Sequence, residues 1–179
     1  MRSPFIQSAA GLAALVAGCA PATVVAPSQI PASLNPPAGQ VVFLETLASG
    51  TQIYECAAKP DQPSVYEWTF RAPEAMLTDR MGRYLGKHYA GPTWEMRDGS
   101  AVVGEVRQRD PGPDPKSIPW LLLGAKSTSG TGMLGGTASI QRVATVGGLA
   151  PSEPCTAAQA RQVVRVPYAA KYYFYRAAS

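Results

Sequence analysis

After residue 40 the chain consists of short runs of β-branched, aromatic and alternating residues, separated by glycine, proline and other turn residues. This pattern is typical of strands, whereas a helical period of apolar residues is almost absent. The predicted strands are Val41–Leu44, Gln52–Cys56, Val65–Phe70, Thr93–Arg97, Ala101–Val106, Ile118–Leu123, Ser139–Val146, Val163–Tyr168 and Lys171–Tyr175. The pattern therefore predicts an all-β chain, an antiparallel β-sandwich or partly closed barrel with one or two short helices.

Several segments predict local structure in more detail. Asp98-Gly99 lies between two alternating runs and predicts a hairpin with a type I′ turn. Ser49-Gly50 predicts a turn between two adjacent strands. Alternate aromatic residues in Val65–Phe70 predict a strand that buries an aromatic face. Adjacent rings in Lys171–Tyr175 point to opposite sides, which predicts a strand covered on both faces.

Two segments have the features of short helices. Ala72–Asp79 has a proline near its start, but glycines follow soon after it, so it is predicted to form a short helix or an edge strand. Thr156–Gln162 is predicted to form a short helix, for which Thr156 or Ser152 would provide the cap.

The first residues predict export. Met1-Arg2 is a short basic start, and the apolar run Phe5–Val16 that follows is too short to span a bilayer as an anchor. Val16-Ala17-Gly18-Cys19 resembles the bacterial lipobox, in which small residues precede a cysteine that becomes the lipidated N-terminus. We therefore predict a lipoprotein signal peptide over residues 1–18 and an acylated Cys19 that attaches the protein to a membrane.

The predicted anchor is followed by a segment without charge or periodicity. Residues 19–37 contain five prolines among small residues, which is typical of an extended tether. Residues 38–179 then form the single β-rich domain. Ala20, rather than aspartate, follows the cysteine, and the resemblance to Gram-negative lipoproteins implies sorting to the periplasmic face of the outer membrane.

Composition excludes some classes of function. The net charge is +4, or +3 after removal of the predicted signal peptide with Arg2, and no run of basic residues is present. Such a weak and scattered charge does not favour nucleic acid as a partner. The one histidine of the chain with scattered carboxylates falls short of a zinc pattern, so neither a metal nor another cofactor is predicted.

Two cysteines remain after the predicted lipidation site. In an exported protein Cys56 and Cys155 would lie in an oxidising compartment, where such a pair normally forms a disulfide. A metal or redox pair is the alternative, although neither cysteine has another cysteine or histidine near it in the sequence. A bridge would close a loop of about 100 residues and stabilise the fold by roughly 4 to 5 kcal/mol.

The stretch Gly86–Glu95 is the best candidate for a site, because it contains His88, Trp94 and Glu95 beside a Gly-Pro corner. His88 is the only side chain with an ordinary pKa near neutrality, and Asp79, Glu95 or Asp98 could assist it as a general base. No Gly-x-Ser-x-Gly elbow is present.

Alternatively, the same stretch could bind a ligand without catalysis. The candidate ligand-binding residues are His88, Trp94, Glu95 and Trp120. Tryptophans are core residues first, but beside a histidine or carboxylate they also hold sugars and aromatic ligands by stacking.

Gly130–Gly135 matches the dinucleotide-binding fingerprint letter for letter. That fingerprint needs a helix after it, inside a βαβ unit, and the following segment is predicted to be a strand instead. We interpret Ser127–Gly136 as a flexible glycine loop.

Several motifs in one order resemble a family of secreted bacterial and fungal domains, the domain of unknown function 3455. The motifs are Gln52–Cys56, His88–Glu95, Ile118–Leu122, Ile140–Arg142, Val166–Tyr168 and Tyr172–Phe174. The resemblance covers roughly Pro37 to Tyr175 and implies export and a compact domain, but no activity or catalytic residues.

The sequence as a whole predicts a lipid-anchored domain of the cell envelope that binds a small molecule, a glycan or a protein partner. The alternative is an envelope hydrolase or lyase with His88 as general base.

Overall fold

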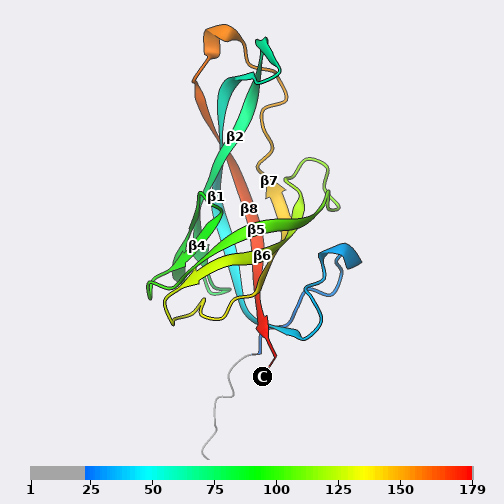
Figure 1. Ribbon diagram of the computed structural model, residues 1–179, viewed down its shortest axis with the longest axis vertical. Coiled ribbons are helices and arrows are strands. Elements are labelled where there is room, and N and C mark those ends of the chain that lie inside the picture. Colours follow the sequence, from blue (N-terminus) through cyan, green and yellow to red (C-terminus); the bar gives the residue numbers. More distant parts are fainter. Residues whose placement is uncertain (1–22, 179) are drawn as a thin grey trace, which may run out of the picture.

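The computed structural model describes residues 23–178, which form one antiparallel sheet closed into a barrel (Figure 1). Its strands are β1 (Gln40–Lys59), β2 (Gln62–Thr78), β3 (Tyr84–Tyr89), β4 (Thr93–Met96), β5 (Ala101–Asp110), β6 (Trp120–Ser129), β7 (Ser139–Gly147) and β8 (Val163–Ala177). Each strand pairs with the next, and β8 pairs with β1 to close the ring. The all-β prediction is confirmed, and of the predicted alternatives the chain forms a barrel, which is fully closed.

The first strand is longer than its sequence pattern indicates. The two strands predicted on either side of Ser49-Gly50 are one continuous strand, β1, so the turn prediction is wrong. Gly50 is present because strand β2 passes close to it: a Cβ at this position would lie 2.1 Å from the carbonyl oxygen of Glu74. A glycine inside a strand can therefore mark a close backbone approach rather than a turn.

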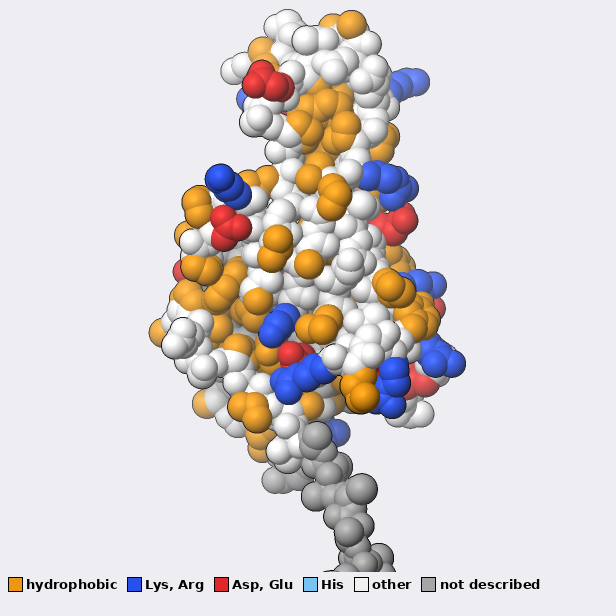
Figure 2. Space-filling model, turned by 180° about the vertical axis from the view of Figure 1, so that it is seen from behind, with side chains coloured by type: hydrophobic (Ala, Val, Ile, Leu, Met, Phe, Trp, Pro, Cys, Tyr) orange, Lys and Arg blue, Asp and Glu red, His pale blue; other side chains and the backbone are white. Residues whose placement is uncertain are grey.

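Strand β2 contains Ala72–Thr78, so this segment is a strand and not a helix. It pairs with β1 on one side, and Ala75–Thr78 also pair with β3 on the other, so this part of β2 is not an edge. Beyond the barrel, β1 and β2 continue as a hairpin that projects from the body (Figures 1 and 2). The aromatic face predicted to be buried lies on this projection, where Phe70 is 48% exposed.

The hairpin of β4 and β5 is confirmed, but its turn is not type I′. A type I′ turn needs two residues with positive φ, and in this turn only Gly99 has one, at 80°. The amide of Gly99 donates to the carbonyl of Met96 at 3.0 Å. The Asp98 side chain accepts from the amide of Ser100 at 2.9 Å, which stabilises the turn in this form.

The structure contains two short 3₁₀ helices, η1 (Ala32–Leu34) and η2 (Ala157–Gln159). The second lies within the predicted helix at residues 156–162. Thr156 precedes it as predicted, and its amide donates to the Gln159 side chain at 3.0 Å. The predicted disulfide between Cys56 and Cys155 is confirmed, and it fastens this segment to β1.

Inward-facing side chains fill the lower part of the barrel. The largest are Trp94, Leu77, Leu123, Ile140, Tyr172 and Phe174, all of them fully buried. On β8 alternate residues face inward, so Tyr172 and Phe174 enter this core while Tyr173 and Tyr175 lie on the outer surface. The prediction that both faces of this strand are covered is confirmed.

The residues before β1 cover the outer aromatic face. Val24 and Ile30 pack against a cluster of Val143, Tyr173 and Tyr175. In η1, Leu34 is 0% exposed, and its carbonyl oxygen accepts from the amide group of Gln141 at 2.6 Å. Residues 23–37, which belong to the predicted tether, therefore run along the barrel wall rather than through solvent.

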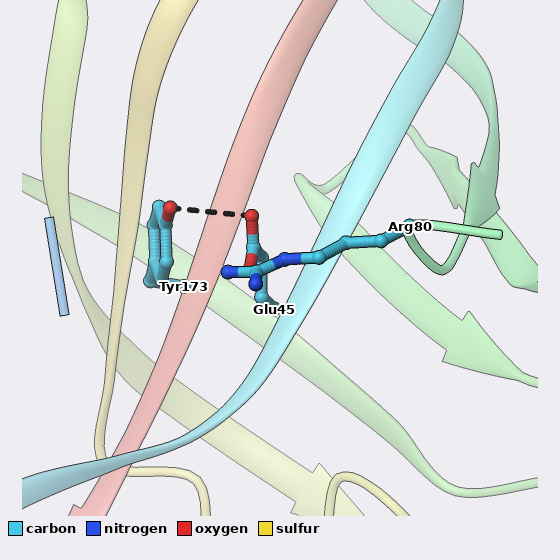
Figure 3. Close-up of polar contacts among 3 residues, drawn as sticks. All are labelled: Glu45, Arg80 and Tyr173. Atoms are coloured by element: carbon cyan, nitrogen blue, oxygen red, sulfur yellow. Dashed lines mark hydrogen bonds and ion pairs between the residues drawn. The ribbon is translucent and has the colours of Figure 1, made fainter. Parts of the chain in front are cut away.

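A buried carboxylate fixes the β2–β3 turn to the same outer surface (Figure 3). Arg80 reaches from the turn across β1 and donates to Glu45 through Nε at 2.7 Å and also through Nη2. The hydroxyl of Tyr173 donates to the other oxygen of Glu45 at 3.2 Å. Hydrogen bonds and the charge of Glu45 raise the pKa of Arg80, whereas burial is the main cause that raises the pKa of Tyr173.

Residues 1–18 and Cys19 lie outside the described residues, so the signal peptide and the lipidation site stay predictions. Within residues 23–178, no helix combines the length and the apolar character needed to cross a bilayer.

Disruption of the disulfide should destabilise the barrel strongly. The bridge joins residues 99 positions apart, and release of such a loop is expected to lower the free energy of unfolding by about 4 kcal/mol. Chemical denaturation of the Cys56→Ser/Cys155→Ser double variant measures this loss, and wild type under reducing conditions should lose as much. An unchanged midpoint in both samples would show that the bridge contributes nothing to stability.

Candidate functional site

The upper part of the barrel is not filled by side chains but encloses a cavity of about 590 Å³. It lies toward the end that carries the β1–β2 projection. The residues that line it are Gln52, Tyr54, Phe70, Arg71, Pro73, His88, Gly91, Pro92, Trp94, Val106, Arg109, Ile118, Pro119, Leu121, Leu123, Arg142 and Tyr172. The lining extends from exposed residues such as Phe70 at the mouth to buried residues such as Trp94 at the floor.

Three rings that pack against one another form the floor of the cavity. The His88 ring lies parallel to the Trp94 ring, with centroids 4.3 Å apart and planes 14° apart. The Tyr172 ring meets both of them edge-on, at 5.1 Å from His88 and 5.2 Å from Trp94. Strand pairing positions this group, because His88 on β3 lies directly opposite Trp94 on β4. The structure thus brings together two of the predicted ligand-binding residues.

His88 is a neutral side chain in this position. It is 2% exposed, and burial lowers its pKa to about 3. Nδ1 lies 2.8 Å from the carbonyl oxygen of Thr93, which can only accept, so Nδ1 carries the proton. Nε2 is consequently left without a proton and is the acceptor atom of the ring.

Several polar side chains of the lining have buried atoms without a hydrogen-bond partner within the described residues. They are Gln52 Nε2, Trp94 Nε1 and the Tyr172 hydroxyl. Each of the three can donate a hydrogen bond. Buried donors without partners are costly to a fold and are rare, so they mark the place where a ligand could bind.

Arg142 on β7 adds a positive charge to the cavity wall. Its Nε and Nη2 donate to the carbonyl oxygen of Pro119 at 3.1 and 2.8 Å. Its charge also lowers the pKa of His88 and opposes the effect of burial on Tyr54 and Tyr172. Arg142 therefore lies among the polar groups of the cavity, and no described carboxylate forms an ion pair with it.

Two more arginines lie toward the mouth. Arg71 pairs with Glu55 outside the cavity at 3.1 Å, whereas Arg109 forms no ion pair with any described residue. Neither aspartate nor glutamate is found among the described residues of the lining. The positive charge of the cavity is therefore uncompensated within its walls.

The predicted acidic helpers of His88 lie elsewhere. Glu95 follows Trp94 and points to the opposite face of β4, where it accepts from the Tyr89 hydroxyl at 2.7 Å and pairs with Lys87 at 3.2 Å. Both bonds, the one to Tyr89 first, lower the pKa of Glu95. Glu95 therefore belongs to the outer surface and does not line the cavity.

The two aspartates that were considered as helpers stabilise turns. Asp79 accepts from the amide of Arg83 at 2.9 Å and pairs with its side chain at 2.6 Å, and the backbone bond is the main cause of the lowered pKa. Asp98 accepts from Ser100 and, at 2.6 Å, from the amide of Met133. Hydrogen bonds, that to the Ser100 side chain first, lower its pKa. Neither aspartate lines the cavity.

Trp120, another candidate from the sequence, also lies outside the cavity. It packs with the outer cluster of Val143, Tyr173 and Tyr175. The residues that sequence reasoning missed are Gln52, Tyr172 and Arg142, whose inward orientation depends on strand register. A lone charge in the apolar strand Ser139–Val146 is the one signal that could have indicated Arg142.

The glycine motif Gly130–Gly135 forms a loop before strand β7, and no helix follows it. The loop is held against the barrel, because the amide of Met133 donates to Asp98 and the Leu134 side chain is fully buried. A Cβ at Gly132 would lie 2.3 Å from a carboxylate oxygen of Asp98. This glycine is therefore required by the contact with the β4–β5 turn.

Among the described residues, no three histidine, cysteine, aspartate or glutamate side chains are grouped closely enough to hold a metal ion.

Burial of the neutral His88 should make stability depend on pH. Unfolded histidine binds a proton near pH 6.5, whereas folded His88 does so only near pH 3, so the unfolded state gains protons as the pH falls between these values. The free energy of unfolding is expected to be about 2 kcal/mol lower at pH 5 than at pH 7. Denaturant titrations at both pH values test this expectation, with His88→Gln as the control that should lose the difference. A His88 ring that titrates near pH 6.5 by NMR would contradict it.

Comparison with known proteins identifies a family. The profile of a family described as "Protein of unknown function (DUF3455)" matches residues 37–176, which is more than half of the chain. No curated protein and no solved structure matches the chain. The matched region begins just before β1 and ends one residue before the end of β8, so it contains nearly the whole barrel and the whole lining of the cavity. The chain belongs to this family of proteins of unknown function, DUF3455.

Proposed function

We propose that the protein is a lipid-anchored domain of the cell envelope that binds a small molecule inside its barrel. The cavity above the His88–Trp94–Tyr172 stack is the observation that carries this proposal. An eight-stranded barrel is wide enough either to be filled by side chains or to hold one small ligand. A volume of about 590 Å³ lies within the usual range for small-molecule sites.

The lining favours a small and largely apolar molecule over a glycan or a protein. Most of its residues are aliphatic, aromatic or proline, and its buried donors without partners are confined to Gln52, Trp94 and Tyr172 within the described residues. A glycan would need polar groups distributed along the whole site, and a protein partner would need an open surface. Binding also needs no carboxylate beside His88, whereas the alternative of general-base catalysis would require one to assist it.

The position of the cavity also suits an anchor at Cys19. The described chain starts at the end of the barrel that carries the C-terminus, opposite the β1–β2 projection (Figure 1). A membrane attachment before residue 23 would leave the mouth of the cavity directed away from the lipid surface. Basic and acidic side chains are interspersed on the face drawn in Figure 2, without a large patch of one sign.

A neutral apolar dye tests the proposed binding. N-phenyl-1-naphthylamine, which fluoresces in apolar surroundings, should bind the purified full-length protein with one site per chain. Val106→Trp would fill the cavity and should weaken this binding about tenfold or more.

The matched control is Val103→Trp, on the same strand but facing outward, and it should leave the affinity unchanged. Protein-free nanodiscs provide the blank if the protein is held in lipid. Equal affinity of both variants, or no saturable binding by wild type, would contradict the proposed function.

Metabolic labelling with palmitate in the native host tests the anchor. Wild type and the Cys56→Ser/Cys155→Ser variant should both incorporate the label, since acylation is expected at Cys19 alone. Cys19→Ala should remove the label completely. Label that persists in Cys19→Ala, or that is absent from wild type, would contradict lipid anchoring.

A further inference from the structure

We propose that the ligand of this cavity is a small amphipathic anion, an apolar body with one negatively charged group that Arg142 binds. This inference rests on the proposed small-molecule function and names the chemical class of the ligand.

The unpartnered hydrogen-bond donors of the lining match the acceptor oxygens of an anion. Gln52 Nε2, Trp94 Nε1 and the Tyr172 hydroxyl are all donors, and each of these residues is at most 2% exposed. A carboxylate, sulfonate or phosphate presents several acceptor oxygens and no donor when it is fully ionised. An anionic group would therefore satisfy donors that a neutral hydrocarbon would leave without partners.

Arg142 carries a positive charge that can bind an anion. Arg142 keeps its charge at every physiological pH and uses only Nε and one Nη2 hydrogen on Pro119. Its Nη1 group is left to bind another acceptor, and no described acidic residue of the lining competes for it. In surroundings of low dielectric constant, a hydrogen bond between guanidinium and an anion is about twice as strong as one between neutral groups.

Much of the rest of the cavity lining is apolar. Phe70, Pro92, Val106 and Leu121 are among its apolar residues. An inorganic anion would leave these surfaces in contact with water, whereas an amphipathic one would cover them. Arg109 at the mouth adds a second positive charge that attracts anions toward the opening.

Two dyes with the same ring system separate this inference from the proposed function. 8-anilino-1-naphthalenesulfonate carries a sulfonate that N-phenyl-1-naphthylamine lacks. The purified full-length protein should bind the sulfonate at least about tenfold more tightly. Arg142→Gln should remove this preference while it leaves the affinity for the neutral dye within about threefold, which also shows that the cavity still forms.

Two further variants serve as controls. Arg142→Lys retains the charge and should keep most of the preference, and Arg165→Gln changes the net charge equally on the outer surface and should keep all of it. Displacement of the sulfonate dye by decanoate or by 1-naphthoate then distinguishes an acyl chain from an aromatic body.

The possible outcomes are distinct. If the neutral dye binds and the sulfonate has no advantage, the anion inference is wrong and the proposed function stands. If Arg142→Gln weakens both dyes equally, Arg142 only supports the β5–β6 loop through Pro119 and the inference is again wrong. If neither dye binds wild type, the proposed function itself fails.

Discussion

Closure of the sheet by pairing between β1 and β8 is the constraint on which the rest of the structure depends. The two strands pair from Gln40 with Ala177 to Glu55 with Val163. Once the ring is closed, every second residue of each strand faces the interior. Apolar side chains in these positions are removed from water, which stabilises the fold. Aromatic and aliphatic side chains fill one end of this interior, and the other end stays open as the cavity. The site is thus the unfilled part of the core.

Closure also creates an outer surface that must be covered. Tyr173 and Tyr175 on β8 face outward, and Val24 and Ile30 from the segment before β1 pack against them. The hydroxyl of Tyr175 donates to Gln141, whose amide donates in turn to the carbonyl of Leu34. Burial raises the pKa of Tyr175 to about 12, so this network keeps its proton at physiological pH. The strand is therefore packed on both sides, which explains the aromatic run Tyr172–Tyr175.

Sequence reasoning could predict the features that depend on local pattern. Most strand positions, the β4–β5 hairpin and the disulfide follow from alternation, turn residues or cysteine count, and residue types alone identify the stretch that contains His88 and Trp94. The features that it missed depend on contacts between distant segments. A glycine such as Gly50 looks the same in the sequence whether it forms a turn or lies where two strands approach closely. Only the position of Glu74 in the folded chain distinguishes the two cases. Likewise, Arg142 lines a cavity because of its register with β8, which its own strand does not encode.

Contacts between distant segments also determine the charge of the cavity. His88 is neutral because burial disfavours its charged form and because the nearby guanidinium of Arg142 repels a second positive charge. Two carboxylates that follow His88 in the sequence, Glu95 and Asp98, are held outside the cavity by Lys87 and by the glycine loop. Arginine alone therefore sets the charge of the inner cavity, and this charge is constant through the neutral pH range. A histidine that looks catalytic in the sequence is, in the folded chain, a neutral aromatic surface and acceptor beside a permanent cation.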